Sequence, residues 1–251
     1  MKKILSVLLT LCSISYLPIV TCAKGKSSKE TIVSGGQKRT YFLYVPEGLD
    51  PRAPAPLIIL LHGSNRDGKS LIEKWKELAD TERIILAGPN SANSSFWAVP
   101  GDGPDFLYDL IEELKVKYRI NSRRVYLFGH SAGASFALQV SLLESEYFAA
   151  TAVHAGALSP EAYPLAENAE RKIPLAIFVG TKDPFFPLTL VRSTRTVLTS
   201  HGFTVELTEI PNHDHWYYDL APKINRDAWE FLRKWQLSDE PQYKHWEFKK
   251  N

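Results

Sequence analysis

One serine stands in a context that is typical of an enzymatic nucleophile. Residues 129–133 read Gly-His-Ser-Ala-Gly, the apolar run 125–128 precedes them, and a helix-compatible stretch begins at Ala132. A sharp turn from a strand into a helix exposes such a serine, and flanking glycines prevent collisions between backbone segments. We therefore predict that Ser131 is a nucleophile, with the positive end of the helix dipole beside it. The alternative is an ordinary glycine turn.

A nucleophilic serine needs a base and a carboxylate that orients the base. In α/β folds with a serine on such a strand-to-helix turn, the chain order is serine, acid, histidine. Asp183 is the only aspartate between Ser131 and His213, and it closely follows the apolar run 175–179. The carboxyl ends of strands are where the catalytic groups of open α/β sheets gather. Asp183 is thus the predicted acid, and the alternative is a turn aspartate before Pro184.

Two histidines compete for the role of the base. His213 and His215 both follow the predicted strand 205–210, and three residues separate Pro211 from His215. This loop length favours His215, and His213 remains the alternative. Side chains two residues apart in an extended loop point to opposite sides, so only one of them can face the serine. The pair with Asp214 offers too few ligands for zinc, and we expect no metal and no cofactor.

Two backbone N–H groups are needed to stabilise the oxyanion that forms when a serine attacks a carbonyl. We predict that they belong to Ala132, directly after the nucleophile, and to Ser64, in the loop after the apolar run 57–61. The His62 side chain in that loop is expected to hydrogen-bond to backbone beneath the site. Trp97 follows another predicted strand, and it either lines the substrate pocket or anchors a surface loop.

Apolar runs without alternation occur between segments of helical periodicity, which predicts parallel strands buried on both faces. The expected fold class is α/β: one domain with a mainly parallel central sheet and helices on both faces. Strands are predicted at residues 41–45, 57–61, 84–87, 125–128, 149–153, 175–179 and 205–210. Helices are predicted at residues 71–79, 106–114, 132–143, 190–199 and 224–235.

The chain of 251 residues divides into four predicted parts. Residues 1–23 are a secretory signal peptide, because two lysines precede a short apolar run and small residues surround the expected cleavage site. The alternative is a buried N-terminal helix. Residues 24–39 are a polar spacer, residues 40–238 the α/β domain, and residues 239–251 a tail that is either docked or disordered. The predicted location is outside the cytoplasm, secreted or periplasmic, and a lipid anchor on Cys22 is the alternative to free release.

The charges, apolar runs and cysteines of the chain limit the classes of partner and the cross-links that we expect. The formal net charge is +2, and removal of Lys2 and Lys3 with the signal peptide leaves 28 basic and 28 acidic residues. Such a balance does not indicate nucleic acid as a partner, and no run is long and apolar enough for a membrane span. Cleavage after Ala23 also removes Cys12 and Cys22, the only cysteines, so we expect no disulfide in the mature chain.

The sequence resembles the α/β-hydrolase superfamily, and within it the secreted branch that contains polyhydroxybutyrate-depolymerase-like and feruloyl-esterase-like enzymes. The resemblance is carried by residues 60–64, 105–107, 124–134, 148–150, 180–184 and 229–232. It implies a catalytic triad of Ser131, Asp183 and a histidine, acting on small-molecule or surface-bound carboxylic esters through an acyl-enzyme. The alternatives are a serine peptidase on the same fold and a non-catalytic binding protein that keeps the fold.

Overall fold

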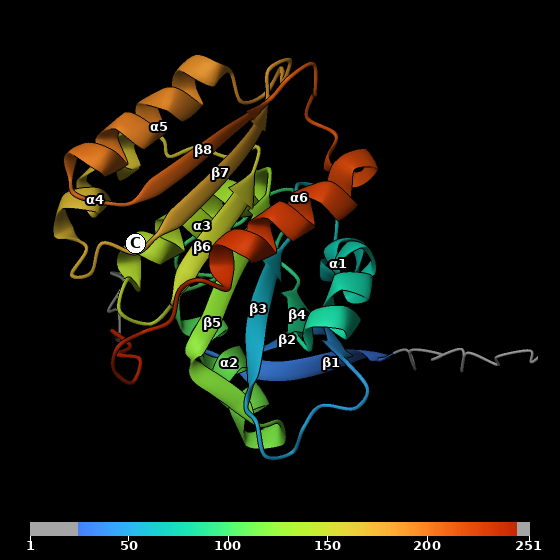
Figure 1. Cartoon of the computed structure of the whole chain (residues 1–251). Helices are drawn as coiled ribbons and strands as arrows, with labels where there is room; N and C mark the ends of the chain where they lie inside the picture. Colours follow the sequence, from blue (N-terminus) through green and yellow to red (C-terminus); the bar gives the residue numbers. More distant parts are fainter. Residues whose placement is uncertain (1–24, 245–251) are drawn as a thin grey trace, which may run out of the picture.

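A single sheet of eight strands organises the protein (Figure 1), whose computed structural model describes residues 25–244. The spatial order is β1-β2-β4-β3-β5-β6-β7-β8. The strands are β1 (Lys26–Ser34), β2 (Gln37–Val45), β3 (Ala55–Leu61), β4 (Ile85–Pro89), β5 (Ile120–His130), β6 (Ala150–His154), β7 (Leu175–Gly180) and β8 (Val205–Ile210). The helices are α1 (Gly68–Glu82), α2 (Asp105–Lys117), α3 (Ala132–Leu143), α4 (Pro164–Asn168), α5 (Leu188–Ser200) and α6 (Tyr217–Leu232), with a 3-10 turn at Pro160–Ala162.

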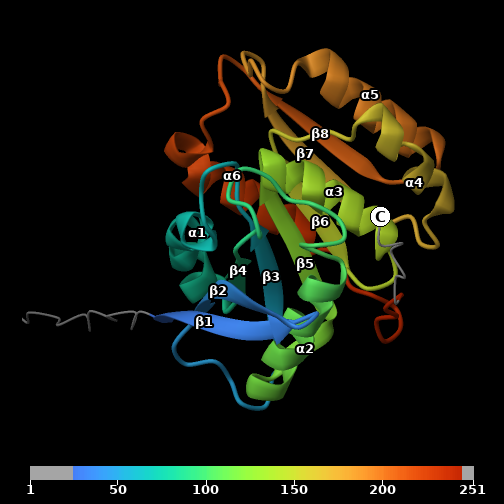
Figure 2. The same ribbon diagram turned by 180° about the vertical axis from the view of Figure 1, so that it is seen from behind.

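Strands β3 to β8 pair in parallel, and β1 and β2 are antiparallel to their neighbours. In β3, Leu57 and Ile59 belong to the core under α2, α3 and α5, whereas Ile58 belongs to the core under α1 and α6. Figures 1 and 2 show these helix layers on opposite faces of the sheet. A strand covered on both faces has no polar side, which explains the continuous apolar run. The predicted single-domain α/β fold is confirmed.

The predicted spacer at residues 24–39 is wrong, because residues 26–34 form β1 and pair along their whole length with β2. This strand lies at the edge of the sheet, and only Ile32 and Ser34 in it are buried. Apart from the exposed Val33, its solvent side carries polar residues, so the strand leaves no continuous apolar run in the sequence. Gly35 and Gly36, both with positive φ, form the two-residue hairpin turn that joins the two strands.

The structure adds detail at helix α6 and in the tail. Helix α6 begins at Tyr217, earlier than the predicted residue 224, and it contains Pro222. The described part of the tail is docked: the Gln242 N–H donates to the Glu146 carbonyl, and the Tyr243 ring stacks on Tyr108. The predicted signal peptide and Cys22 lie outside the described residues. Within residues 25–244, no helix combines the length and the apolar character needed to cross a bilayer.

Candidate active site

The pairing of β3 with β5 brings two loops together at the carboxyl edge of the sheet. Leu61 pairs with Gly129, so the residues that follow each strand lie next to each other. The chain leaves β3 towards β4 on one side and returns to β5 on the other. Such a reversal of strand order opens a crevice at the carboxyl ends of the strands, where α/β proteins bind ligands.

The turn around Ser131 is dictated by close backbone contacts. Ser131 has a φ of 57° and ψ of −122°, a conformation that L-residues rarely adopt. A Cβ on Gly129 would lie 2.3 Å from the Gly133 carbonyl oxygen, and one on Gly133 would lie 2.1 Å from the Leu61 carbonyl oxygen. Both positions therefore require glycine. The result is a serine raised between β5 and α3, as the sequence pattern predicts.

His215 lies between Ser131 and Asp183. Its Nε2 is 2.9 Å from Ser131 Oγ, and its Nδ1 is 2.9 Å from Asp183 Oδ2. A carboxylate only accepts hydrogen bonds, so Nδ1 carries the proton and Nε2 is free to accept the serine O–H. The geometry thus selects one tautomer of the imidazole, and three residues from the ends of three strands share one line of hydrogen bonds.

Asp183 is held as an anion in a buried position. Its side chain has no exposed surface, and Oδ1 accepts hydrogen bonds from the N–H groups of Phe185 and Phe186, both at 2.9 Å. Burial by itself would raise the pKa of Asp183. The hydrogen bonds from His215 and the two N–H groups outweigh it, so the pKa of this carboxyl is lowered from its usual value.

His213 belongs to a different cluster. Its Nε2 lies 3.2 Å from Nε2 of His154, whose Nδ1 lies 3.1 Å from Nδ1 of His130. Burial lowers the pKa of His130 to about 3 and that of His154 to about 2, so both rings are neutral at neutral pH. The two candidate bases therefore point in different directions, as the extended-loop argument predicts, and the structure brings only His215 to Ser131.

A pocket of about 520 Å³ opens in front of Ser131. Its walls are the loop 63–66, the turn 130–132 and a group of rings from the loops after β7 and β8 and from the start of α6. Among the rings, Phe185 is 70% exposed and Trp216 is 44% exposed, so the pocket has an apolar rim that faces solvent. The Arg66 guanidinium lies over the rings of Trp216 and Tyr218, at 5.2 and 5.3 Å from their centroids.

Both predicted oxyanion residues, Ser64 and Ala132, line this pocket. Ala132 is the first residue of α3, where an N–H has no acceptor within the helix. A Cβ on Gly63 would lie 3.2 Å from the Ser131 Cβ, which shows how closely the loop before Ser64 approaches the nucleophile. The two backbone segments named in the sequence analysis therefore flank the same serine.

Trp97 is not among the pocket-lining residues. It is half-buried, its Nε1–H donates to the His62 carbonyl at 2.8 Å, and its ring stacks on Phe136. Of its two predicted roles, the contacts match the loop anchor and not the pocket wall. His62 behaves as expected: it is buried, and its ring nitrogens contact the Gly63 carbonyl and the Ser91 N–H.

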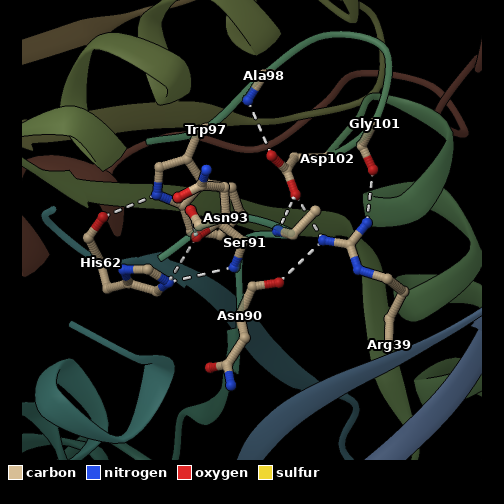
Figure 3. A network of polar contacts seen from close by, with 10 residues as sticks. Arg39, His62, Asn90, Ser91, Asn93, Trp97, Ala98, Gly101 and Asp102 are labelled. Carbon is tan, nitrogen blue, oxygen red and sulfur yellow. Dashed lines mark hydrogen bonds and ion pairs between the residues drawn. The ribbon is translucent and has the colours of Figure 1, made fainter. Parts of the chain in front are cut away.

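Sequence analysis missed a buried ion pair behind this loop. Arg39 and Asp102 are both nearly inaccessible to solvent at the carboxyl edge of the sheet. Nη2 of Arg39 lies 2.6 Å from Oδ1 of Asp102 (Figure 3). Isolated arginines and aspartates are common in sequences, so neither residue carried a signal. Among residues 25–244, no group of three or more His, Cys, Asp or Glu side chains has the arrangement to hold a metal ion.

With this geometry in view, comparison with known proteins decides the family. The dienelactone hydrolase family profile matches residues 95–238. The chain belongs to the dienelactone hydrolase family. The match begins just before Trp97 and includes Ser131, Asp183 and His215, whereas the loop 63–66 on the other side of the pocket lies outside the matched residues.

Curated relatives and solved structures extend this picture. The chain is 30% identical over 152 residues to a bifunctional acetylxylan esterase/xylanase from Neocallimastix patriciarum, and 30% identical over 128 residues to a poly(3-hydroxyalkanoate) depolymerase from Paucimonas lemoignei. These alignments cover 59% and 46% of the chain, but only 22% and 30% of the two relatives. The fold is similar to that of a ferulic acid esterase from Anaeromyces mucronatus, with a TM-score of 0.68 and 17% identity over 86% of the chain and 94% of that structure.

Proposed function

We propose that the protein hydrolyses carboxylic esters through an acyl-enzyme formed on Ser131. The observation that carries this proposal is the unbroken line of hydrogen bonds from Ser131 through His215 to the buried Asp183, at the mouth of an open pocket. The names of the relatives, which include an acetylxylan esterase and a polyester depolymerase, support an ester as the substrate.

In the first half of the reaction, His215 Nε2 takes the proton from Ser131 Oγ while Oγ attacks the ester carbonyl carbon. The negative charge on the carbonyl oxygen is stabilised by the N–H groups of Ser64 and Ala132. His215 then gives its proton to the leaving alcohol oxygen as the carbon–oxygen bond breaks. Asp183 keeps Nδ1 protonated and stabilises the transient imidazolium.

In the second half, water attacks the acyl carbon and gives a proton to His215. The bond between the acyl carbon and Oγ breaks, the carboxylic acid leaves, and the proton returns to Ser131. The exposed rings of Phe185 and Trp216 give the pocket an apolar border, and its open mouth suits small esters or esters presented on a surface.

A two-part experiment tests this proposal. A fluorophosphonate probe should label wild-type protein, and Ser131→Ala should abolish both the labelling and the turnover of 4-nitrophenyl esters, a loss on the order of 10⁶ in kcat. A peptidase would instead prefer amino-acid 4-nitroanilides over the esters. Absence of labelling and of turnover in the wild type would contradict the proposal and favour a binding protein.

We propose further that the protein is exported and that residues 1–23 are removed. Support comes from the composition of this segment, with two lysines before a short apolar run and small residues at the expected cleavage site. The mass of intact exported protein should correspond to a chain that begins near Lys24. A chain that begins at Cys22 with added lipid would contradict free release and indicate an anchored lipoprotein.

A further inference from the structure

We propose that Trp97, held by the segment 90–102, positions the oxyanion hole by fixing the loop that carries Ser64 against the helix that carries Ala132. This inference rests on the proposed ester hydrolysis, and it gives Trp97 a role different from the predicted substrate contact.

Trp97 touches both elements that supply the oxyanion donors. Its Nε1–H donates to the carbonyl of His62, two residues before Ser64, at 2.8 Å, and its ring lies 4.9 Å from the His62 imidazole. Its ring also stacks on Phe136 with 5.1 Å between centroids and an angle of 19°. Phe136 lies on α3 four residues after Ala132, which is about one helical turn. One indole therefore bridges the two sides of the hole.

Three further hydrogen bonds join the segment 90–97 to the same loop. The Ser91 N–H donates to His62 Nε2 at 3.2 Å, and the Asn65 N–H donates to the Ser94 carbonyl at 2.7 Å. At the end of the loop, the Gly68 N–H donates to Asn90 Oδ1 at 2.9 Å. Since burial lowers the pKa of His62, its ring stays neutral and Nε2 remains an acceptor. The loop is thus bound by this segment on both sides of Ser64.

The segment itself is fixed by Asp102 (Figure 3). The Asp102 carboxylate accepts hydrogen bonds from the N–H groups of Ala92 at 2.6 Å and Ala98 at 2.8 Å, so it ties both ends of the stretch that contains Trp97. The Arg39 guanidinium pairs with the same carboxylate and also donates to the carbonyls of Asn90 and Gly101. A buried, fully paired carboxylate of this kind holds its loop in one conformation.

Rigid support matters because an oxyanion hole works by preorganisation. Its donors must lie 2.7–3.1 Å from a charge that exists only in the transition state, and removal of one donor costs about 10²–10³ in kcat. A donor that is displaced by a fraction of an ångström loses part of that effect. Loosening the Ser64 loop should therefore lower kcat without weakening the binding of the ground-state ester.

Trp97→Phe is the direct test, because it keeps an aromatic ring beside Phe136 and removes only the indole N–H and part of the ring. We expect kcat for 4-nitrophenyl acetate to fall about tenfold, a fraction of the loss of a whole donor, while KM changes less than about twofold. Trp229→Phe is the matched control, since the Trp229 indole N–H donates to Glu82 at 2.9 Å between α6 and α1. It should leave kcat unchanged whatever its effect on the melting temperature.

A second readout separates positioning of the hole from general loss of structure. Oxygen and sulfur differ in size and in hydrogen-bond strength, so the thionoester of the same acid depends less on the oxyanion donors than the ester does. Trp97→Phe should therefore lower the ratio of ester to thionoester turnover, and Trp229→Phe should not. An unchanged ratio, or a loss confined to KM, would overturn the inference while wild-type activity and Ser131 labelling leave the proposed function standing. If the wild type neither turns over esters nor is labelled, the proposed function itself fails.

Discussion

Two segments at the same edge of the sheet are fixed in opposite ways. The turn 129–133 after β5 is determined by contacts among neighbouring residues and with the end of β3, where backbone atoms leave no room for a Cβ. The segment 90–102 after β4 is determined by polar contacts with Arg39, whose partners are 51–63 residues away in the chain. Local steric contacts hold the first segment, and polar contacts between residues far apart in the chain hold the second.

The two regions should therefore tolerate different kinds of change. The turn presents a reactive side chain whose truncation to alanine leaves few packing contacts missing, so this change should remove the chemistry and leave the fold in place. The segment 90–102 depends on a buried charge pair, so a change there should affect the free energy of unfolding.

The largest effect is expected at His215. His215→Ala removes the proposed base and should lower kcat/KM for 4-nitrophenyl esters on the order of 10⁶, with the urea midpoint nearly unchanged. His213→Ala is the paired control, because His213 contacts His154 and not Ser131, and it should cost about tenfold or less. Equal losses in both variants, or the reverse order, would show that the base has been assigned to the wrong ring.

Asp183→Asn should lower kcat by about 10⁴, because an amide in this position favours the wrong tautomer of His215. The Asn oxygen still accepts from the N–H groups of Phe185 and Phe186, so the loop should keep its conformation. Steady-state kinetics measures the loss, and circular dichroism checks the fold. A loss of less than tenfold would mean that the carboxylate does not orient the base.

Asp102→Asn should act on stability more than on chemistry. The Arg39 charge would remain buried without its partner, and breaking a buried pair costs about 3 kcal/mol or more of unfolding free energy. Urea denaturation of this variant should show a clearly lower midpoint, whereas Glu73→Gln, which breaks an exposed pair with Lys76, should not. An unchanged urea midpoint for Asp102→Asn would show that the stability of the segment 90–102 does not depend on its buried ion pair.

Acid should destabilise the protein through two buried histidine rings. The pKa values of His130 (about 3) and His154 (about 2) lie below the unfolded value of about 6.5, so below that pH the unfolded chain binds more protons than the folded chain. The free energy of unfolding should therefore fall as the pH drops from 6.5 towards 3, by at most about 1.4 kcal/mol per pH unit for each ring. Urea titrations between pH 6.5 and 5 should show this slope, and His154→Gln should make it shallower. A slope that is the same in both proteins would contradict the argument.

Much of the α/β architecture was predictable because parallel strands leave continuous apolar runs, as at residues 57–61 and 175–179. The candidate site was predictable for a related reason. Ser131 and Asp183 each follow a continuous apolar run, whereas His215 follows the alternating edge strand β8, and all three lie at one edge of the sheet. The choice between His213 and His215 was less certain, because two residues of loop length decide it.

The features that could not be predicted depend on contacts that the sequence does not show. The strand β1 is polar on its solvent side apart from the exposed Val33, so it leaves no continuous apolar run in the sequence. Arg39 and Asp102 acquire their meaning only when the fold brings them within 2.6 Å. Trp97 could be placed after a strand, but whether its ring faced the pocket or Phe136 required the structure.

The backbone conformation of Ser131 links the activity of the protein to its thermal stability. Its φ of 57° is a conformation that glycine adopts readily and that any residue with a Cβ holds only at a cost of about 1–3 kcal/mol. Of two inactive variants, Ser131→Gly should therefore have a higher melting temperature than Ser131→Ala, because glycine adopts this φ without strain. The nucleophile is therefore expected to be retained at the expense of some heat resistance.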